Sequence, residues 1–283
     1  MQIKTVPNRP PRIALPVPAM RHHYDVVVVG SGYGGSIAAS RMARAGQHVC
    51  ILERGEERWP GEYPEKDKDI LAEVQFTSSK GHVGKKTGLY EFNLSEDQAA
   101  LVGCGLGGTS LINAGTALEL DPRLWIDPAW PAEIRSSPIS IKRGYDLARR
   151  MLQPVPIPSC KATPRKLTAL ARLTKALPGA DFYRAPLTVS FEDGVNAAGV
   201  QQCASTMSGN ESTGVNDGSK TTTLVTYVAD AWNYGAEIFC LCSVERVAFK
   251  EETGKWVVYF QWLDVGLHIV SAQNFENSFW LKS

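Results

Sequence analysis

An apolar run that ends in a glycine-rich turn constrains this chain more than any other feature. Residues 24–29 read Tyr-Asp-Val-Val-Val-Val, which is typical of a buried strand, and Gly30, Gly32 and Gly35 follow with G-x-G-x-x-G spacing. Gly30 permits a tight turn, Gly32 lets backbone N–H groups approach a pyrophosphate, and Gly35 allows the next helix to pack against the strand. That helix, expected over roughly residues 35–45, directs its positive N-terminus at the phosphates.

A second apolar run, residues 49–52, ends at Glu53, eighteen residues after the last of those glycines. A carboxylate at this position accepts hydrogen bonds from a ribose diol and repels a 2′-phosphate. The spacing therefore predicts a βαβ dinucleotide-binding unit and disfavours an NADP-type ligand. The first turn alone leaves both FAD and NAD open.

A second glycine cluster has five glycines within thirteen residues, from Gly103 to Gly115. Such a segment is costly to order unless a partner packs against its backbone. The apolar residues Leu106, Leu111 and Ile112 lie within it, which argues against the alternative of a glycine-rich surface loop. We expect a ligand to lie against this backbone.

These segments resemble the glucose-methanol-choline (GMC) family of FAD-dependent oxidoreductases, and most of all its cholesterol-oxidase-like branch. The resembling residues are 25–35, Glu53-Arg54-Gly55, 103–115 with Ala117-Leu118-Glu119 after it, and 230–237. The similarity is discontinuous and runs from about residue 22 to about residue 265. It implies an α/β fold, with a Rossmann-like FAD-binding domain and part of a second, smaller α+β substrate domain.

The resemblance also implies FAD as the cofactor. In that family the second glycine segment passes along the flavin, so Gly107, Gly108, Asn113 and Gly115 are expected to line the ring and pyrophosphate, and Val244 to offer a backbone contact to adenine. The full set expected to bind FAD is Gly30, Ser31, Gly32, Tyr33, Gly34, Gly35, Glu53, Arg54, Gly103, Gly105, Gly107, Gly108, Thr109, Ser110, Asn113, Ala114, Gly115, Thr116 and Val244.

Breaks in composition divide the chain into segments. Prolines crowd the first residues, and a second group of prolines begins at Pro154. The expected organisation is an extended proline-rich arm at 1–23, a first FAD-binding part at 24–152 with an excursion at 56–97, a partial substrate region at 153–219, a return to the FAD-binding domain at 220–265, and an atypical tail at 266–283.

Local patterns predict further elements. Residues 56–97 are polar and irregular, with a short helix expected near 69–76. The other expected elements are a helix at 166–177, a strand at 182–191, a helix at 227–234, a strand at 236–240, and a hairpin formed by 244–250 and 255–262.

Composition excludes several classes of function. The net charge of +1 gives no electrostatic case for nucleic acid or a membrane surface, and no apolar run is long enough to span a membrane. No apolar signal core is present, so a cytoplasmic or other intracellular location is expected. The six cysteines are scattered, so reduced thiols and no metal site are expected.

The resemblance implies oxidation of an alcohol or sterol-like CH–OH donor by hydride transfer to the flavin, while a histidine accepts the hydroxyl proton. None of the five histidines, His22, His23, His48, His82 and His268, lies in the family's catalytic context. No catalytic residue is therefore predicted.

Residues after Trp262 depart from the family pattern, which predicts an incomplete chain with little or no turnover. One alternative is a non-catalytic flavin- or nucleotide-binding protein. An NAD-dependent dehydrogenase is disfavoured, since the 103–115 segment has no role there. The sequence leaves the oligomeric state open.

Overall fold

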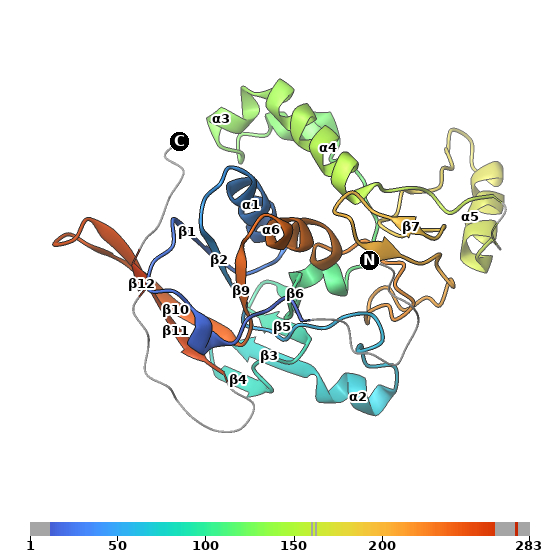
Figure 1. Ribbon diagram of the computed structural model, residues 1–283. Helices are drawn as coiled ribbons and strands as arrows, with labels where there is room; N and C mark the ends of the chain where they lie inside the picture. Colours follow the sequence, from blue (N-terminus) through green and yellow to red (C-terminus); the bar gives the residue numbers. More distant parts are fainter. Residues whose placement is uncertain (1–11, 160, 162, 264–274, 277–283) are drawn as a thin grey trace.

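A small parallel sheet organises the computed structural model, which describes residues 12–159, 161, 163–263 and 275–276 (Figure 1). The sheet has the order β1–β2–β9, formed by Val26–Val29, Val49–Leu52 and Glu237–Phe239. Both pairings are parallel, and helix α1 (Tyr33–Arg44) connects β1 to β2. The predicted βαβ unit and the α/β fold class are confirmed, and β9 confirms the strand expected near residues 236–240.

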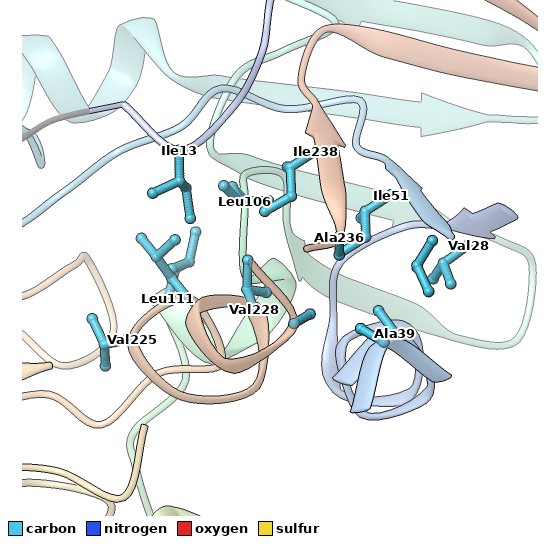
Figure 2. Close-up of a cluster of buried hydrophobic side chains, with 14 of the residues drawn as sticks. Ile13, Val28, Ala39, Ile51, Leu106, Leu111, Val225, Val228, Ala236 and Ile238 are labelled. Atoms are coloured by element: carbon cyan, nitrogen blue, oxygen red, sulfur yellow. The ribbon is translucent and has the colours of Figure 1, made fainter. Parts of the chain in front are cut away.

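Small side chains on α1 allow the helix to lie close to the sheet. Ala39 and Ala43 are buried against a core that includes Val28 of β1, Ile51 of β2 and Ile238 of β9 (Figure 2). All four residues of β2 are buried, because this strand is the central one of the three. The nearly continuous apolar sequence of β2 is typical of a strand covered on both faces.

A second sheet of four strands occupies the segment predicted to be an irregular excursion. Its order is β4–β3–β5–β6, and a short helix, α2, precedes it. The prediction of an irregular 56–97 segment was wrong, since backbone pairing holds these strands together. They bury the polar side chains of Gln75 and Glu91 and expose apolar ones such as Phe76, which is the reverse of the usual pattern. The elements are α2 (Asp67–Ala72), β3 (Val74–Ser78), β4 (Gly81–Gly84), β5 (Tyr90–Leu94) and β6 (Ala99–Gly103).

The C-terminal hairpin agrees with its prediction. Strands β10 (Cys242–Lys250) and β11 (Lys255–Trp262) pair antiparallel, and β12 (Phe275–Glu276) pairs with β11. A bulge between Val244 and Arg246 shifts the register by one residue.

The remaining helices surround the first sheet or project from it. Helix α5 (Arg165–Ala176) confirms the helix predicted at 166–177. The helix predicted at 227–234 begins earlier, as a π-helix, η4 (Leu224–Val228), that continues into α6 (Ala229–Asn233). The other elements are η1 (Val17–Ala19), η2 (Gly108–Leu111), η3 (Pro122–Ile126), α3 (Ala132–Arg135), α4 (Pro138–Leu152), β7 (Gly194–Val195) and β8 (Gln201–Gln202).

The prediction of a strand at 182–191 was wrong. Only isolated bridges form there, at Leu187 and Val189. Pro186 has no N–H to donate, which interrupts a continuous ladder at this point.

Helices α1 and α6 lie side by side and are joined by a buried carboxylate (Figure 1). Asp230 of α6 is 2% exposed and accepts a hydrogen bond from Ser40 Oγ at 2.5 Å. Arg44 donates to both carboxylate oxygens, from Nε at 2.8 Å and from Nη2 at 2.6 Å. Burial acts to raise the pKa of Asp230, but the hydrogen bonds from Arg44 and Ser40 outweigh it and hold that pKa below its ordinary value.

Replacing Asp230 by Asn should lower the free energy of unfolding by about 2–3 kcal/mol, because a charged acceptor between two helices is lost. The matched control is Asp146→Asn. It breaks an exposed i,i+3 pair with Arg149 and should cost less than about 0.5 kcal/mol. Urea denaturation of both variants measures the difference.

The carboxylate of Asp230 also makes the stability of the fold depend on pH. A folded-state pKa below the unfolded value of about 4 stabilises the fold above that pH, and this stabilisation is lost as the pH falls through the acid range. Asp230→Asn should lack this part of the acid destabilisation. An unchanged acid profile in the variant would contradict the role assigned to the pair.

Candidate functional site

The first glycine turn presents an open backbone surface at the N-terminus of α1. Gly30 has a φ of +82°, Gly32 is the N-cap, and α1 begins at Tyr33. A Cβ added at Gly35 would collide with the Gly30 carbonyl, so only glycine allows this helix to approach β1. The first N–H groups of a helix have no intrahelical acceptor, so those of α1 are available to an anionic group.

The second glycine segment packs directly on the first. Gly108 has a φ of +58°, and a Cβ added there would lie 2.6 Å from the Cα of Gly32. A side chain at residue 108 would therefore separate the two segments. The two clusters, recognised separately in the sequence, form one continuous backbone surface.

Ser31 holds the two segments together at their contact. Its hydroxyl donates to Glu53 Oε2 at 2.5 Å and accepts from the Gly107 N–H at 2.9 Å. The Ser31 N–H also donates to Glu53 Oε2, at 3.0 Å, and the side chain is fully buried. One hydroxyl thus links the end of β2, the first turn and the second glycine segment.

Thr223, which lies far along the chain, also holds the second glycine segment, a role that the sequence analysis did not predict. Its hydroxyl donates to the Gly107 carbonyl at 2.7 Å, and its N–H donates to Ser110 Oγ at 2.9 Å. Ser110 Oγ also donates to the Gly107 carbonyl, at 2.6 Å. Thr223 precedes the buried η4 helix, and the only available signal was a run of three threonines at residues 221–223.

Glu53 lies at the end of β2 with its carboxylate directed into the first turn. Besides the two bonds from Ser31, it accepts one from the Gly55 N–H at 2.8 Å. The side chain is 6% exposed. Three of the roughly four lone pairs of the carboxylate are used within the protein, so its contact with a ribose diol stays a prediction.

Arg54, another residue predicted to bind FAD, forms an ion pair with the buried Glu91 of β5. Burial acts to raise the pKa of Glu91, but the hydrogen bond and charge of Arg54 and a bond from Thr77 outweigh it, so the pKa of Glu91 is lowered. Arg54 therefore connects β2 to the second sheet, and its charge is largely balanced within the protein.

The far end of the second segment is also held. Asn113 Nδ2 donates to the Tyr33 hydroxyl at 2.8 Å, and its Oδ1 accepts from the Gly115 N–H at 3.1 Å. A buried lysine, Lys220, contacts the carbonyls of Leu111 and Asn113. Lys220 is a second residue that the sequence did not single out.

The other predicted residues lie around this surface. Gly103 ends β6, and its N–H donates to Thr109 Oγ1 at 3.1 Å. Gly105 packs against Gly55. The last three lie further from the contact: Ala114 is exposed, Thr116 forms an isolated bridge with Leu187, and Val244 lies two residues beyond Cys242, whose N–H donates to the Glu53 carbonyl.

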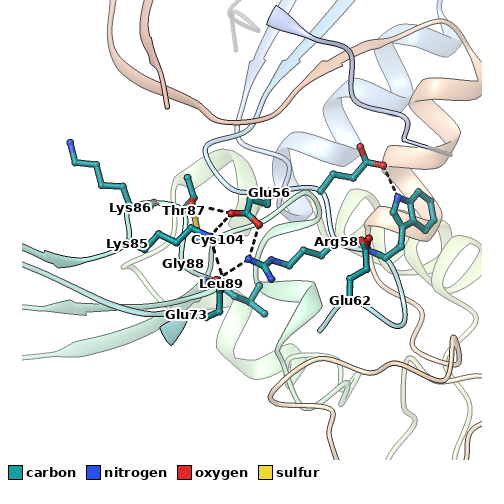
Figure 3. Close-up of polar contacts among 12 residues, drawn as sticks. Glu56, Arg58, Glu62, Glu73, Lys85, Lys86, Thr87, Gly88, Leu89 and Cys104 are labelled. Atoms are coloured by element: carbon teal, nitrogen blue, oxygen red, sulfur yellow. Dashed lines mark hydrogen bonds and ion pairs between the residues drawn. The ribbon is translucent and has the colours of Figure 1, made fainter. Parts of the chain in front are cut away.

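A charged cluster anchors the flank of the site (Figure 3). Arg58 Nη2 lies 2.8 Å from both Glu56 Oε2 and Glu73 Oε2, and Lys85 Nζ lies 2.5 Å from Glu56 Oε1. The Glu56 carbonyl accepts from the Leu106 N–H at 3.0 Å. The cluster therefore connects the loop after β2, the second sheet and the second glycine segment.

Two of the described histidines, His48 and His82, make contacts away from the glycine segments. A ring nitrogen of His48 lies 3.0 Å from Asp25, and a ring nitrogen of His82 lies 3.1 Å from the Thr77 hydroxyl. His268 lies outside the described residues. Within the described ranges, no group of three or more His, Cys, Asp or Glu side chains is arranged to hold a metal ion, and no helix there is both long and apolar enough to cross a membrane.

The open side of the first turn fits the phosphates of a dinucleotide. An added Cβ at Gly30, Gly32 or Gly34 would meet no protein atom within 4 Å. The backbone there faces open space at a positive helix end, while the opposite side of the turn is packed tightly against Gly108. This combination of open backbone and helix N-terminus suits an anion approaching the main chain.

Comparison with known proteins matches the part of the chain that contains both glycine segments. The model of the family described as GMC oxidoreductase matches residues 24–264. An uncharacterized GMC-type oxidoreductase from Mycobacterium tuberculosis is 32% identical over 143 residues, which cover 47% of this chain and 20% of the relative. A cholesterol oxidase from the same species is 26% identical over 257 residues, which cover 84% of this chain and 42% of the relative.

A third relative matches over a shorter stretch. A long-chain-alcohol oxidase from Arabidopsis thaliana is 51% identical over 45 residues, which cover 16% of this chain and 6% of the relative. The chain therefore matches less than half the length of each of these relatives.

Gly35→Ala should destabilise the fold by more than about 2 kcal/mol, because its Cβ meets the Gly30 carbonyl and forces α1 away from β1. The control is Gly34→Ala in the same helix. Its Cβ meets nothing, and it should be neutral or stabilising by up to about 1 kcal/mol. Thermal denaturation without ligand compares them, and equal stabilities would contradict the close packing at Gly35.

Proposed function

The chain belongs to the GMC oxidoreductase family, and on that premise we propose that it binds FAD where its two glycine segments meet. The observation that best supports this is the packing of Gly108 on Gly32, with the Gly107 N–H bonded to Ser31 Oγ. An NAD site needs only the first segment, and the second has no role there. A ligand that extends from the first turn along the second segment accounts for both.

Each part of the surface has a binding role in this proposal. The N-terminus of α1, with Gly32 and Gly34, holds the pyrophosphate, and Glu53 receives the ribose. The end of the second segment, Asn113 to Gly115, lies along the ring system. When bound, FAD supplies the hydride acceptor for oxidation of a CH–OH group.

We also propose that residues 24–152 and 220–265 together form the cofactor-binding part of the protein. The sheet supports this division, since β1 and β2 come from the first stretch and β9 from the second. Thr223, which lies in the second stretch, bonds to Gly107 in the first. Residues 153–219 would then contribute to the substrate side.

The proposed substrate is an alcohol, and a sterol or other bulky alcohol is favoured. Two similar proteins support this class, one named a cholesterol oxidase and the other a long-chain-alcohol oxidase. Such a reaction needs a base for the hydroxyl proton, and we assign that role to none of the residues at the glycine surface.

The alternative is a non-catalytic flavin-binding protein of the same family. His48 and His82 favour this alternative, because they contact Asp25 and Thr77 and neither is placed as a base beside the glycine segments. The alternative shares the FAD site and differs only in turnover.

Gly32→Ala tests the FAD site separately from the fold. The added methyl meets no protein atom, so the stability without ligand should change by less than about 0.5 kcal/mol. The affinity for FAD should fall about 10- to 100-fold, because the methyl occupies the path of the pyrophosphate; this corresponds to about 1.4–2.8 kcal/mol. Titration followed by flavin fluorescence measures the affinity.

Gly144→Ala is the matched control, since its Cβ also meets nothing and it lies in the exposed part of α4. It should leave the FAD affinity unchanged. Equal FAD affinities for the Gly32 and Gly144 variants would exclude the pyrophosphate from the first turn.

Anaerobic mixing of the FAD-loaded chain with a long-chain alcohol or cholesterol separates the two functions. Bleaching of the flavin absorbance is the result expected of an oxidoreductase. Stable absorbance with FAD bound would favour the non-catalytic alternative.

A further inference from the structure

Lys220 is buried and directs its ammonium group at three main-chain carbonyls. The residue is 6% exposed. Its Nζ donates to the carbonyl oxygens of Asn113 at 2.5 Å, Glu211 at 2.6 Å and Leu111 at 3.1 Å. The three donors of an ammonium group match these three acceptors.

A buried lysine without a carboxylate bonded to it is costly, because burial disfavours the charged form. Burial lowers the pKa of Lys220 to about 7, while the charge of Glu211 acts in the opposite direction. A methionine would fill the same space without this cost. A methionine could not donate to the three carbonyls, so these contacts indicate a specific role for the charged side chain.

Two of those carbonyls belong to the end of the second glycine segment. Leu111 is the last residue of η2, where a short helix leaves carbonyls without intrahelical donors. The side-chain amide of Asn113 in turn donates to the Tyr33 hydroxyl and accepts from the Gly115 N–H. Lys220 therefore holds the backbone from which Asn113 reaches the first turn.

Residues 220–223 hold the second glycine segment on both sides of η2. Thr223 bonds to Gly107, just before η2, and Lys220 bonds to Leu111 and Asn113, at the end of η2 and just after it. This short stretch thus fixes the spacing across the whole η2 turn.

We propose that Lys220 is a positioning residue of the flavin site, which holds the Leu111–Asn113 backbone in the conformation that receives the cofactor. This inference rests on the proposed FAD function. It adds that the ammonium form is required, since a neutral amine has two N–H donors for three carbonyls. Deprotonation leaves one carbonyl without a donor and loosens the end of the segment.

Two titratable groups face Lys220. Glu211 lies on the loop that supplies the third carbonyl, and Tyr63 lines the same small cavity beside Leu111. Burial raises the pKa of Tyr63, so the phenol stays neutral near pH 7. Because the pKa of Lys220 is about 7, FAD affinity should fall severalfold between about pH 6 and pH 8.5.

Lys220→Met tests the role, with Tyr24→Phe as the control for a general loss of stability. Tyr24 is buried, and its hydroxyl donates to Glu237 at the opposite end of β1 from Gly30. Amide hydrogen exchange over residues 107–116 reports the loop without ligand, and flavin fluorescence reports FAD affinity at both pH values.

Lys220→Met should speed exchange in that segment at least ~5-fold, weaken FAD binding at pH 6 at least ~10-fold, and abolish the pH dependence. Tyr24→Phe should leave all three readouts as in the wild type. If Lys220→Met does not fold, the pH dependence of FAD affinity in the wild type decides, and a flat profile would overturn the inference.

Unchanged exchange in Lys220→Met, or faster exchange with unchanged FAD affinity, would overturn the positioning role while leaving the FAD site intact. Failure of the wild type to bind FAD at either pH would instead overturn the proposed function, together with the inference that rests on it. The exchange data distinguish these cases, since they require no cofactor.

Discussion

The hydroxyl of Ser31 makes the contact on which the candidate site depends. It joins the carboxylate of Glu53 to the N–H of Gly107, and so connects the first glycine turn, the end of β2 and the second glycine segment. A buried hydroxyl with both a donor and an acceptor partner fixes their relative positions more tightly than apolar contact alone. The open backbone of Gly32 keeps its position because this contact and the packing of Gly108 lie beneath it.

Rigidity around this contact comes from elements distant in sequence. The pair between Asp230 and Arg44 fixes α1 against α6, and Thr223 extends the same support to Gly107. Together these interactions order glycine-rich backbone before any ligand arrives, which reduces the conformational entropy lost on binding. A preorganised surface of this kind suits a long cofactor that contacts mostly main chain.

The sequence predicted the parts of the site whose chemistry is local. The turn at Gly30 to Gly35 follows from short-range spacing, and so does the βαβ unit that contains it. The second sheet was missed because its strands, such as β4, carry few buried apolar residues, so no alternation marked them.

Thr223 and Lys220 were missed for a different reason. Their roles arise only when the chain returns to the glycine segment about a hundred residues later, and nothing in their local sequence indicates which carbonyls they meet. The ion pair of Arg54 with Glu91 is of the same kind, since it depends on where β5 lies. Contacts of this sort follow from the tertiary fold, which periodicity does not specify.

The visible absorption spectrum of the purified, desalted chain tests the central claim most directly. A preorganised surface built from both glycine segments predicts flavin absorption bands that stay with the protein after desalting, either as purified or after incubation with FAD and removal of the excess. A folded protein that is colourless after the same incubation and desalting, and that binds NAD instead, would contradict the account.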